Sequence, residues 1–134
     1  MYLVINNFIL PNSIELVNEK GATFSILPLR KGGRGVLKMI DKIIKKNRIK
    51  IKKIKGIIII TDHSSFTRTR IVVTIANLIS FFSNIPLSLI AAENIKDKKM
   101  EKIIKIGKRK LKKKMIFPVY NKQPNITITT INKE

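Results

Sequence analysis

The most continuous apolar segment lies in the middle of the chain and predicts the centre of a sheet. Ile57 to Ile60 are apolar at every position, without the alternation expected of a strand with one face in water. Such a run is typical of a strand that is buried on both faces. An apolar helix is predicted from about Ser65 to Ser83, followed by a second apolar strand from Leu87 to Ala91. Two strands joined through one helix predict a parallel, right-handed crossover.

The first part of the chain predicts three antiparallel strands, over Met1 to Ile5, Ser13 to Val17 and Ala22 to Leu29. The segment from Asn18 to Gly21 between the last two is typical of a hairpin turn, because its glycine can adopt a positive φ angle. The expected fold class is therefore α/β. Three antiparallel strands are followed by helix, strand, helix, strand and helix, and the later strands pair in parallel.

Two of the predicted helices carry apolar residues on more than one side. The helix from Val36 to Lys46 has one stripe of Leu37, Ile40 and Ile44 and another of Val36, Met39 and Ile43. The later helix has a stripe of Ile71, Ile75, Leu78, Ile79 and Phe82, widened by Val72, Val73, Ala76 and Phe81. A helix that lies on one sheet needs a single apolar face. The second face is therefore expected to meet another helix, either of this chain or of a partner.

The remaining segments are strongly basic. Asn47 to Lys55 is a basic connector, and a last helix is predicted from Glu93 to about Ile106. The chain of 134 residues is long enough for one domain with a modest core. We expect residues 1–95 to form the main α/β unit, and residues 96–134 to add a basic helix and a tail that pack on the same domain.

The net charge of +20 favours polyanions, RNA above all. The densest run predicts a nucleic-acid contact at Lys108, Arg109, Lys110, Lys112 and Lys113. A solvated helix end is the competing interpretation of that run. The excess of lysine could also reflect an AT-rich genome, and aromatic residues, which RNA-binding surfaces often use, make up only 6%.

Composition also narrows the location and the class of protein. There is no cysteine, so disulfides and thiolate metal sites are excluded. No apolar run approaches the ~20 residues of a membrane span, and the chain starts on a strand pattern without a basic leader. We expect a cytoplasmic protein without membrane contact.

No arrangement of residues indicates a catalytic, metal or cofactor site. The eight acidic residues are dispersed along the chain, whereas a two-metal nuclease needs clustered carboxylates. His63 stands beside Asp62 and Ser64, but adjacent residues cannot generally align as nucleophile, base and orienting acid. We expect a serine here to cap the following helix. The glycine-rich loop from Arg30 to Gly35 lacks the form of a phosphate-binding motif.

Two segments resemble the bacterial TsaB (YeaZ) family. The first is Ser65-Phe66-Thr67 followed by Arg70-Ile71, an apolar helix and then Asn84-Ile85-Pro86-Leu87. The second is Pro118-Val119-Tyr120 followed by Pro124-Asn125-Ile126-Thr127, which is similar to the end of many family members. The segment from Val36 to Ile44 also resembles a family helix. Asn6-Asn7 and Asp62-His63-Ser64 depart from the family's acidic first loop and its glycine-rich loop.

The resemblance implies a fold, a role and a partner. It implies a single lobe of the actin-like (RNase H-like) fold joined directly to the family's tail, with the second lobe deleted. The implied role is that of a noncatalytic subunit of the complex that makes threonylcarbamoyladenosine in tRNA. The implied partner is a TsaD-type catalytic subunit, with a homodimer as the alternative and tRNA contact left open. The expected partner-binding residues are Val36, Met39, Ile40, Ile43, Arg70, Val72, Ile75 and Ile79.

A second interpretation comes from the charge. A small basic RNA- or ribosome-binding protein could keep this fold without the complex. The two helices with surplus apolar surface argue against that interpretation, because an RNA surface would not cover them.

Overall fold

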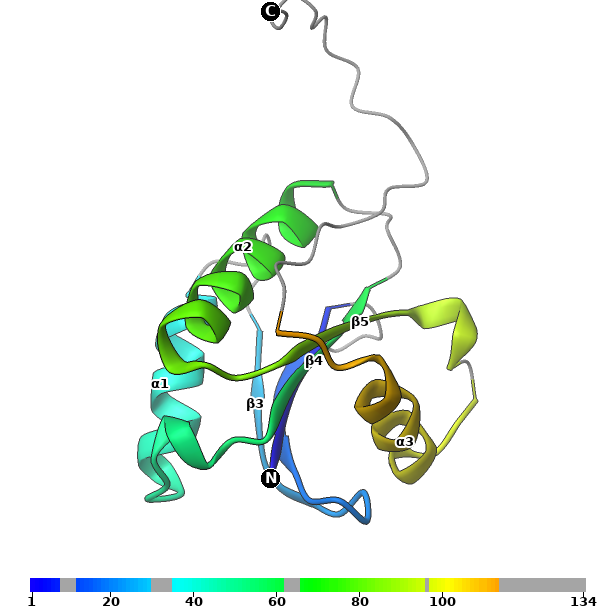
Figure 1. Ribbon diagram of the computed structural model, residues 1–134, viewed down its shortest axis with the longest axis horizontal. Coiled ribbons are helices and arrows are strands. Elements are labelled where there is room, and N and C mark those ends of the chain that lie inside the picture. The colour runs from blue at the N-terminus through cyan, green and yellow to red at the C-terminus, as the bar shows by residue number, and fades with distance from the viewer. Residues whose placement is uncertain (8–11, 30–34, 62–65, 96, 114–134) are drawn as a thin grey trace, which may run out of the picture.

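A five-stranded sheet forms the middle layer of the protein, and helices cover both of its faces (Figure 1). The computed structural model describes residues 1–7, 12–29, 35–61, 66–95 and 97–113. The glycine-rich loop before Gly35, residues 62–65 and the family-like tail from residue 114 lie outside these ranges, so predictions that concern them stay predictions.

The order of elements along the chain matches the predicted fold class. The elements are β1 (Tyr2–Asn6), β2 (Ser13–Val17), β3 (Thr23–Pro28), α1 (Val36–Lys46), η2 (Ile51–Lys53), β4 (Gly56–Thr61), α2 (Phe66–Ser83), β5 (Leu87–Ala91), η3 (Ala92–Asn94) and α3 (Met100–Lys110). The strand order in the sheet is β3-β2-β1-β4-β5. β2 is antiparallel to both β1 and β3, whereas β1, β4 and β5 pair in parallel. The predicted α/β architecture is confirmed.

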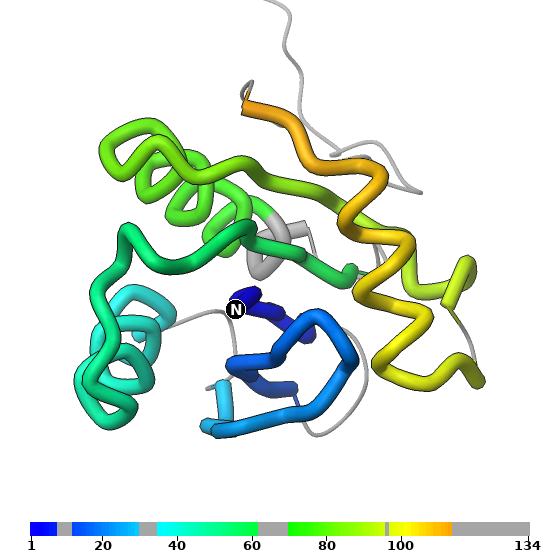
Figure 2. The backbone as a smooth tube through the Cα atoms, turned by 60° about the horizontal axis from the view of Figure 1, so that its bottom comes forward, coloured from blue at the N-terminus to red at the C-terminus, as the bar shows by residue number. Residues whose placement is uncertain are grey.

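The isoleucine run of β4 is buried on both faces, as its lack of alternation predicts. Ile57 and Ile59 contribute to the core beneath α1 and α2, and Ile58 and Ile60 to the core beneath α3. All four side chains are at most 2% exposed. Figure 2 shows α1 and α2 on one side of the strands and α3 on the other. Alternate side chains of one strand therefore hold two separate apolar layers together.

The predicted hairpin turn between β2 and β3 is present. Asn18 Oδ1 accepts hydrogen bonds of 2.9 Å from the backbone N–H groups of Lys20 and Ala22. Gly21 has a φ of 87°, and a Cβ atom there would lie 2.5 Å from the backbone nitrogen of Glu101. Glycine is therefore needed at this position both for the turn and for its close packing against the start of α3.

The last helix differs from its predicted position. Ala92–Asn94 form a short 3-10 helix, the backbone N–H of Lys98 donates to the carbonyl of Ile95, and α3 extends only from Met100 to Lys110. Asp97 has a φ of 61°, which a continuous α-helix does not allow. The apolar spacing that includes Ile95 is real, since Ile95 is buried in the same core, but it spans a turn rather than one helix.

Gly107 gives a test of how tightly α3 lies on the sheet. A Cβ atom there would lie 2.6 Å from Cδ1 and 2.8 Å from Cγ1 of the buried Ile58. We predict that Gly107→Ala lowers the free energy of unfolding by about 1–3 kcal/mol through overpacking. Helix propensity alone predicts the opposite sign, a gain of about 1 kcal/mol. Urea denaturation decides between the two, with the exposed Lys102→Ala as the control. A stabilised Gly107→Ala variant would contradict this packing.

Candidate functional site

Helix α1 buries the side that carries three of the predicted partner-binding residues. Val36, Ile40 and Ile43 are at most 2% exposed and belong to the core between the sheet and the helices. These three side chains are covered by their own sheet, so in this structure they are not accessible to a partner. Met39 is half-buried, and Leu37, which the prediction left out, is 57% exposed. The accessible apolar surface of α1 thus lies at Leu37 and Met39.

Helix α2 is rotated so that its smaller residues face the sheet. Val72, Val73, Ala76 and Ser80 are buried. Val72, another predicted partner-binding residue, is likewise covered by the sheet and is not accessible to a partner in this structure. The helix ends as predicted, where Asn84 adopts a φ of 56° and the backbone N–H of Ile85 donates to the carbonyl of Ser80 at 3.1 Å. The hydroxyl of Ser80 also donates to the carbonyl of Ile85, which fixes this turn.

The larger apolar residues of α2 remain at the surface. Ile71, Ile75, Leu78 and Phe82 follow one another at intervals of four, three and four residues, so they share one face of the helix. We call these four residues the outer α2 face. Ile71 and Ile75 are half-buried, whereas Leu78 is 51% and Phe82 79% exposed. The ring of the exposed Phe81 packs edge-on against Phe82, with centroids 5.2 Å apart.

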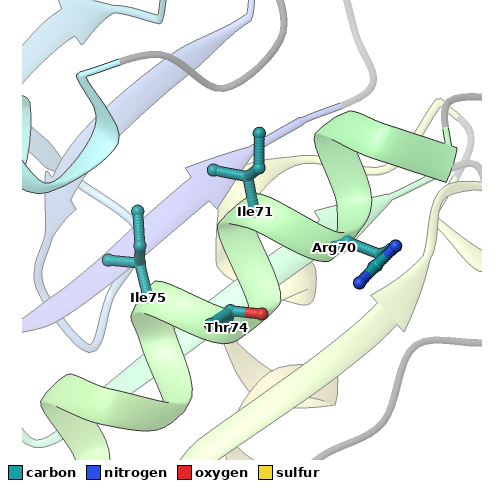
Figure 3. A pocket seen from close by; sticks show the side chains of 4 residues that line it. All are labelled: Arg70, Ile71, Thr74 and Ile75. Carbon is teal, nitrogen blue, oxygen red and sulfur yellow. The ribbon is translucent and has the colours of Figure 1, made fainter.

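The other predicted partner-binding residues lie beside this face. Ile79 is half-buried against the core, and Arg70 is exposed. Arg70, Ile71, Thr74 and Ile75 line a hollow of about 400 Å³. Figure 3 shows the two isoleucines side by side along the helix, with Arg70 and Thr74 directed to another side of it. This first part of α2 therefore offers apolar contact next to a guanidinium and a hydroxyl group.

One further apolar patch was not singled out from the sequence. Phe24 and Ile26 of the edge strand β3 are 58% and 57% exposed. They alternate with the buried Ser25 and Leu27, so the strand has one face on the core and one in water. The sequence pattern indicates the opposite orientation, because the outward positions of an edge strand are normally polar, whereas here Ser25 is buried and Phe24 and Ile26 are exposed.

The carboxyl end of β1 carries two buried amides, beside the end of β4. Asn6 and Asn7 are 9% and 2% exposed, and the backbone N–H of Asn7 donates to the carbonyl of Ile60 at 2.9 Å. The side-chain oxygens of Asn7 and Asn12 are buried and have no hydrogen-bond partner among the described residues. Across the described ranges, no group of three or more His, Cys, Asp or Glu residues could hold a metal ion.

All five residues of the predicted nucleic-acid contact are exposed. Lys108, Arg109 and Lys110 form the last turn of α3, and Lys112 pairs with Leu87 at the start of β5. The Lys55 ammonium, 2.9 Å from Glu19 Oε1, holds the pKa of the Glu19 carboxyl below its usual value, with a further contribution from Lys108 at 3.9 Å. Glu19 therefore stays ionised at neutral pH, and two ammonium groups share one carboxylate.

The comparisons with known proteins identify the fold. No protein-family model matches the chain, and no similar curated protein was found. Among solved structures, YeaZ from Pseudomonas aeruginosa matches with a TM-score of 0.55 and 14% sequence identity, covering 67% of this chain and 44% of that one. The chain therefore has a YeaZ-like fold and spans less than half the length of that structure. No helix in the described part of the chain is long and apolar enough to cross a membrane.

Substitutions on the two sides of the helix pair should differ sharply in their effect on stability. Ile40→Ala removes a core side chain that is 2% exposed and is expected to cost about 2–5 kcal/mol in the free energy of unfolding. Phe82→Ser changes a side chain that is 79% exposed and is expected to alter this free energy by at most about 0.5 kcal/mol. Urea denaturation measures both values. Equal losses would show that Phe82 belongs to the core and would contradict the orientation of α2.

Proposed function

We propose that this chain is a noncatalytic, TsaB-like subunit that binds a TsaD-type catalytic subunit through the outer α2 face. The observation that carries the proposal is the exposure of Leu78 and Phe82 on a YeaZ-like fold. The resemblance in sequence includes Phe66-Thr67 at the start of α2 and Asn84-Ile85-Pro86 directly after its end. The proposed role in tRNA threonylcarbamoyladenosine synthesis comes from that family resemblance.

The exposed side chains favour a protein partner on physical grounds. Large apolar and aromatic residues that form a contiguous surface are typical of the centre of a protein interface. Removing such side chains from water stabilises a complex by roughly 25 cal/mol per Å² of apolar surface. Leu37 of α1 lies on the neighbouring helix of the same layer and could extend the contact.

The proposed partner residues are those that the fold leaves accessible. They are Leu37, Met39, Arg70, Ile75, Ile79 and the remainder of the outer α2 face. Arg70 at the first part of the helix adds a charged group beside the apolar surface, and charged groups of this kind contribute orientation and specificity at an interface. A homodimer would use the same surface twice about a two-fold axis, and it is the alternative assembly.

A noncatalytic role agrees with the two asparagines at the carboxyl end of β1. Asn6 and Asn7 carry no charge, so they cannot supply the carboxylate that orients a metal ion or a water molecule in actin-like enzymes. The second candidate function, a basic RNA-binding protein with the same fold, is favoured by the charge of +20. It does not account for the outer α2 face.

Binding of the TsaD-type subunit should depend on the outer α2 face. We predict that Leu78→Lys together with Phe82→Lys weakens binding to the TsaD-type subunit of the same organism by at least about tenfold, which corresponds to about 1.4 kcal/mol. Both positions are more than half exposed, so the fold should remain. Isothermal titration calorimetry of the purified pair measures the affinity, and circular dichroism checks the fold.

The matched control for that experiment lies on β3. Phe24→Lys with Ile26→Lys makes the same change in charge at positions of similar exposure. We expect this control to bind the catalytic subunit as tightly as the unchanged chain. Equal loss in both double variants would contradict the proposed surface. Light scattering of the unchanged chain alone then separates a heterodimer from a homodimer.

Nucleotide binding should be absent from the isolated chain. We predict no saturable heat on titration with ATP at micromolar concentrations, with or without magnesium, and no ATP hydrolysis. The reason is that a nucleotide site needs converging donors in a concave site, whereas Asn6 and Asn7 stand where an acidic loop would be required. One-to-one binding of ATP would overturn the noncatalytic proposal and would direct attention to the loops at 30–35 and 61–67.

A further inference from the structure

Two basic segments that are far apart in the sequence meet at the edge of the sheet where the parallel strands begin. The first is the end of α1 and the connector to β4, with Lys45, Lys46, Arg48, Lys50, Lys52, Lys53 and Lys55. The second is the end of α3 and the residues after it, with Lys108, Arg109, Lys110, Lys112 and Lys113. All of these residues are exposed. We call this surface the basic edge.

Backbone contacts join the two segments. The backbone N–H of Lys55 donates to the carbonyl of Met1 at 2.8 Å, which places the connector at the start of β1. Leu87 and Lys112 exchange two backbone hydrogen bonds of 2.8 Å, which places the end of α3 at the start of β5. β4 lies between β1 and β5, so both segments border its first residue. The side chain of Leu111 also lies close to Gly56 at that point.

A carboxylate marks the junction of the two segments. Glu19, from the turn between β2 and β3, lies 2.9 Å from the ammonium of Lys55 and 3.9 Å from that of Lys108. The segments 45–55 and 108–113 contain no acidic residue. One carboxylate therefore faces many cations, and the edge keeps a large positive charge.

The basic residues of the connector are held in place by apolar neighbours. Ile54 is 3% exposed, and Ile49 and Ile51 pack against the same core. These isoleucines alternate with the lysines, so burying them directs the lysines outward. On the other segment, Leu111 packs against the core beneath α3 and so directs the neighbouring basic side chains outward. The backbones that carry the cations are therefore anchored before any ligand arrives, which lowers the entropic cost of binding.

We propose that the basic edge binds the phosphodiester backbone of a folded RNA. Its cations come from α1, the connector and α3, which reach the edge from both faces of the sheet (Figure 2). A straight duplex or a flat membrane surface could meet only one side of such an edge, whereas the bent backbone of a folded RNA can follow it. The inference does not require the catalytic partner proposed above, because the outer α2 face takes no part in it.

The test measures binding of a fluorescently labelled transfer RNA transcript to the full chain by anisotropy over a series of salt concentrations. We expect affinity to fall linearly with salt on a logarithmic plot. Two triple variants remove charge from the edge: Lys50→Gln, Lys52→Gln and Lys53→Gln on the connector, and Lys110→Gln, Lys112→Gln and Lys113→Gln after α3. Each should lower affinity at least about tenfold at ~0.1 M salt and reduce the salt slope by about 2.

A third triple variant serves as the matched control. Lys38→Gln, Lys98→Gln and Lys102→Gln remove the same charge from exposed positions nearer the opposite ends of α1 and α3. We expect this control to keep most of the affinity and slope of the unchanged chain. Equal effects in all three triples would mean diffuse attraction and would overturn the proposal. Absence of salt-dependent binding, or equal affinity for a straight DNA duplex or for phosphatidylserine vesicles, would overturn it as well.

Discussion

The burial of β4 on both faces is the constraint on which the rest of the structure depends. Because Ile57 and Ile59 need cover on one side and Ile58 and Ile60 on the other, helices must lie on both faces of the sheet. α1 and α2 share one face, and α3 crosses the other after the turn at Asp97. Gly107 lets α3 approach Ile58 closely enough to close that second layer.

This arrangement also determines which surfaces are left for partners. Small and branched residues such as Val36, Val72 and Ala76 occupy the faces of α1 and α2 that are buried against the sheet. The larger residues Leu78 and Phe82 are consequently directed away from the sheet. In the same topology, the connector after α1 leads to the first residue of β4, and the residues after α3 pair with the first residue of β5. The lysines of both segments therefore lie at the same edge of the sheet. The exposed outer α2 face and the basic edge therefore arise from one layered fold.

The sequence predicted the strands, their parallel pairing and the end of α2, because these depend on local signals. The isoleucine run of β4 and the Asn84-Ile85-Pro86 stop are examples. The rotation of the two helices could not be predicted in the same way. α2 is apolar nearly all round, so its own pattern does not say whether Val72 or Phe82 faces the sheet; packing against β4 and β5 decides.

Two other features needed tertiary information. The apolar spacing from Ile95 onward could not reveal the turn before α3, because Ile95 is buried whether or not the helix is continuous. The basic edge could be predicted only by knowing that Lys112 pairs with the start of β5. That pairing brings residues 108–113 beside Lys55. In the sequence these segments are a basic connector and a separate charge run, and a solvated helix end was the competing interpretation of the second.

The most direct test of the central claim is recovery of the tagged full-length chain from its native cell, followed by identification of the bound proteins after ribonuclease treatment. The account predicts a TsaD-type catalytic subunit in near-equal amount that remains bound when RNA is digested. Recovery with ribosomal or other RNA-bound proteins alone, lost on digestion, would contradict the assignment as a TsaB-like subunit.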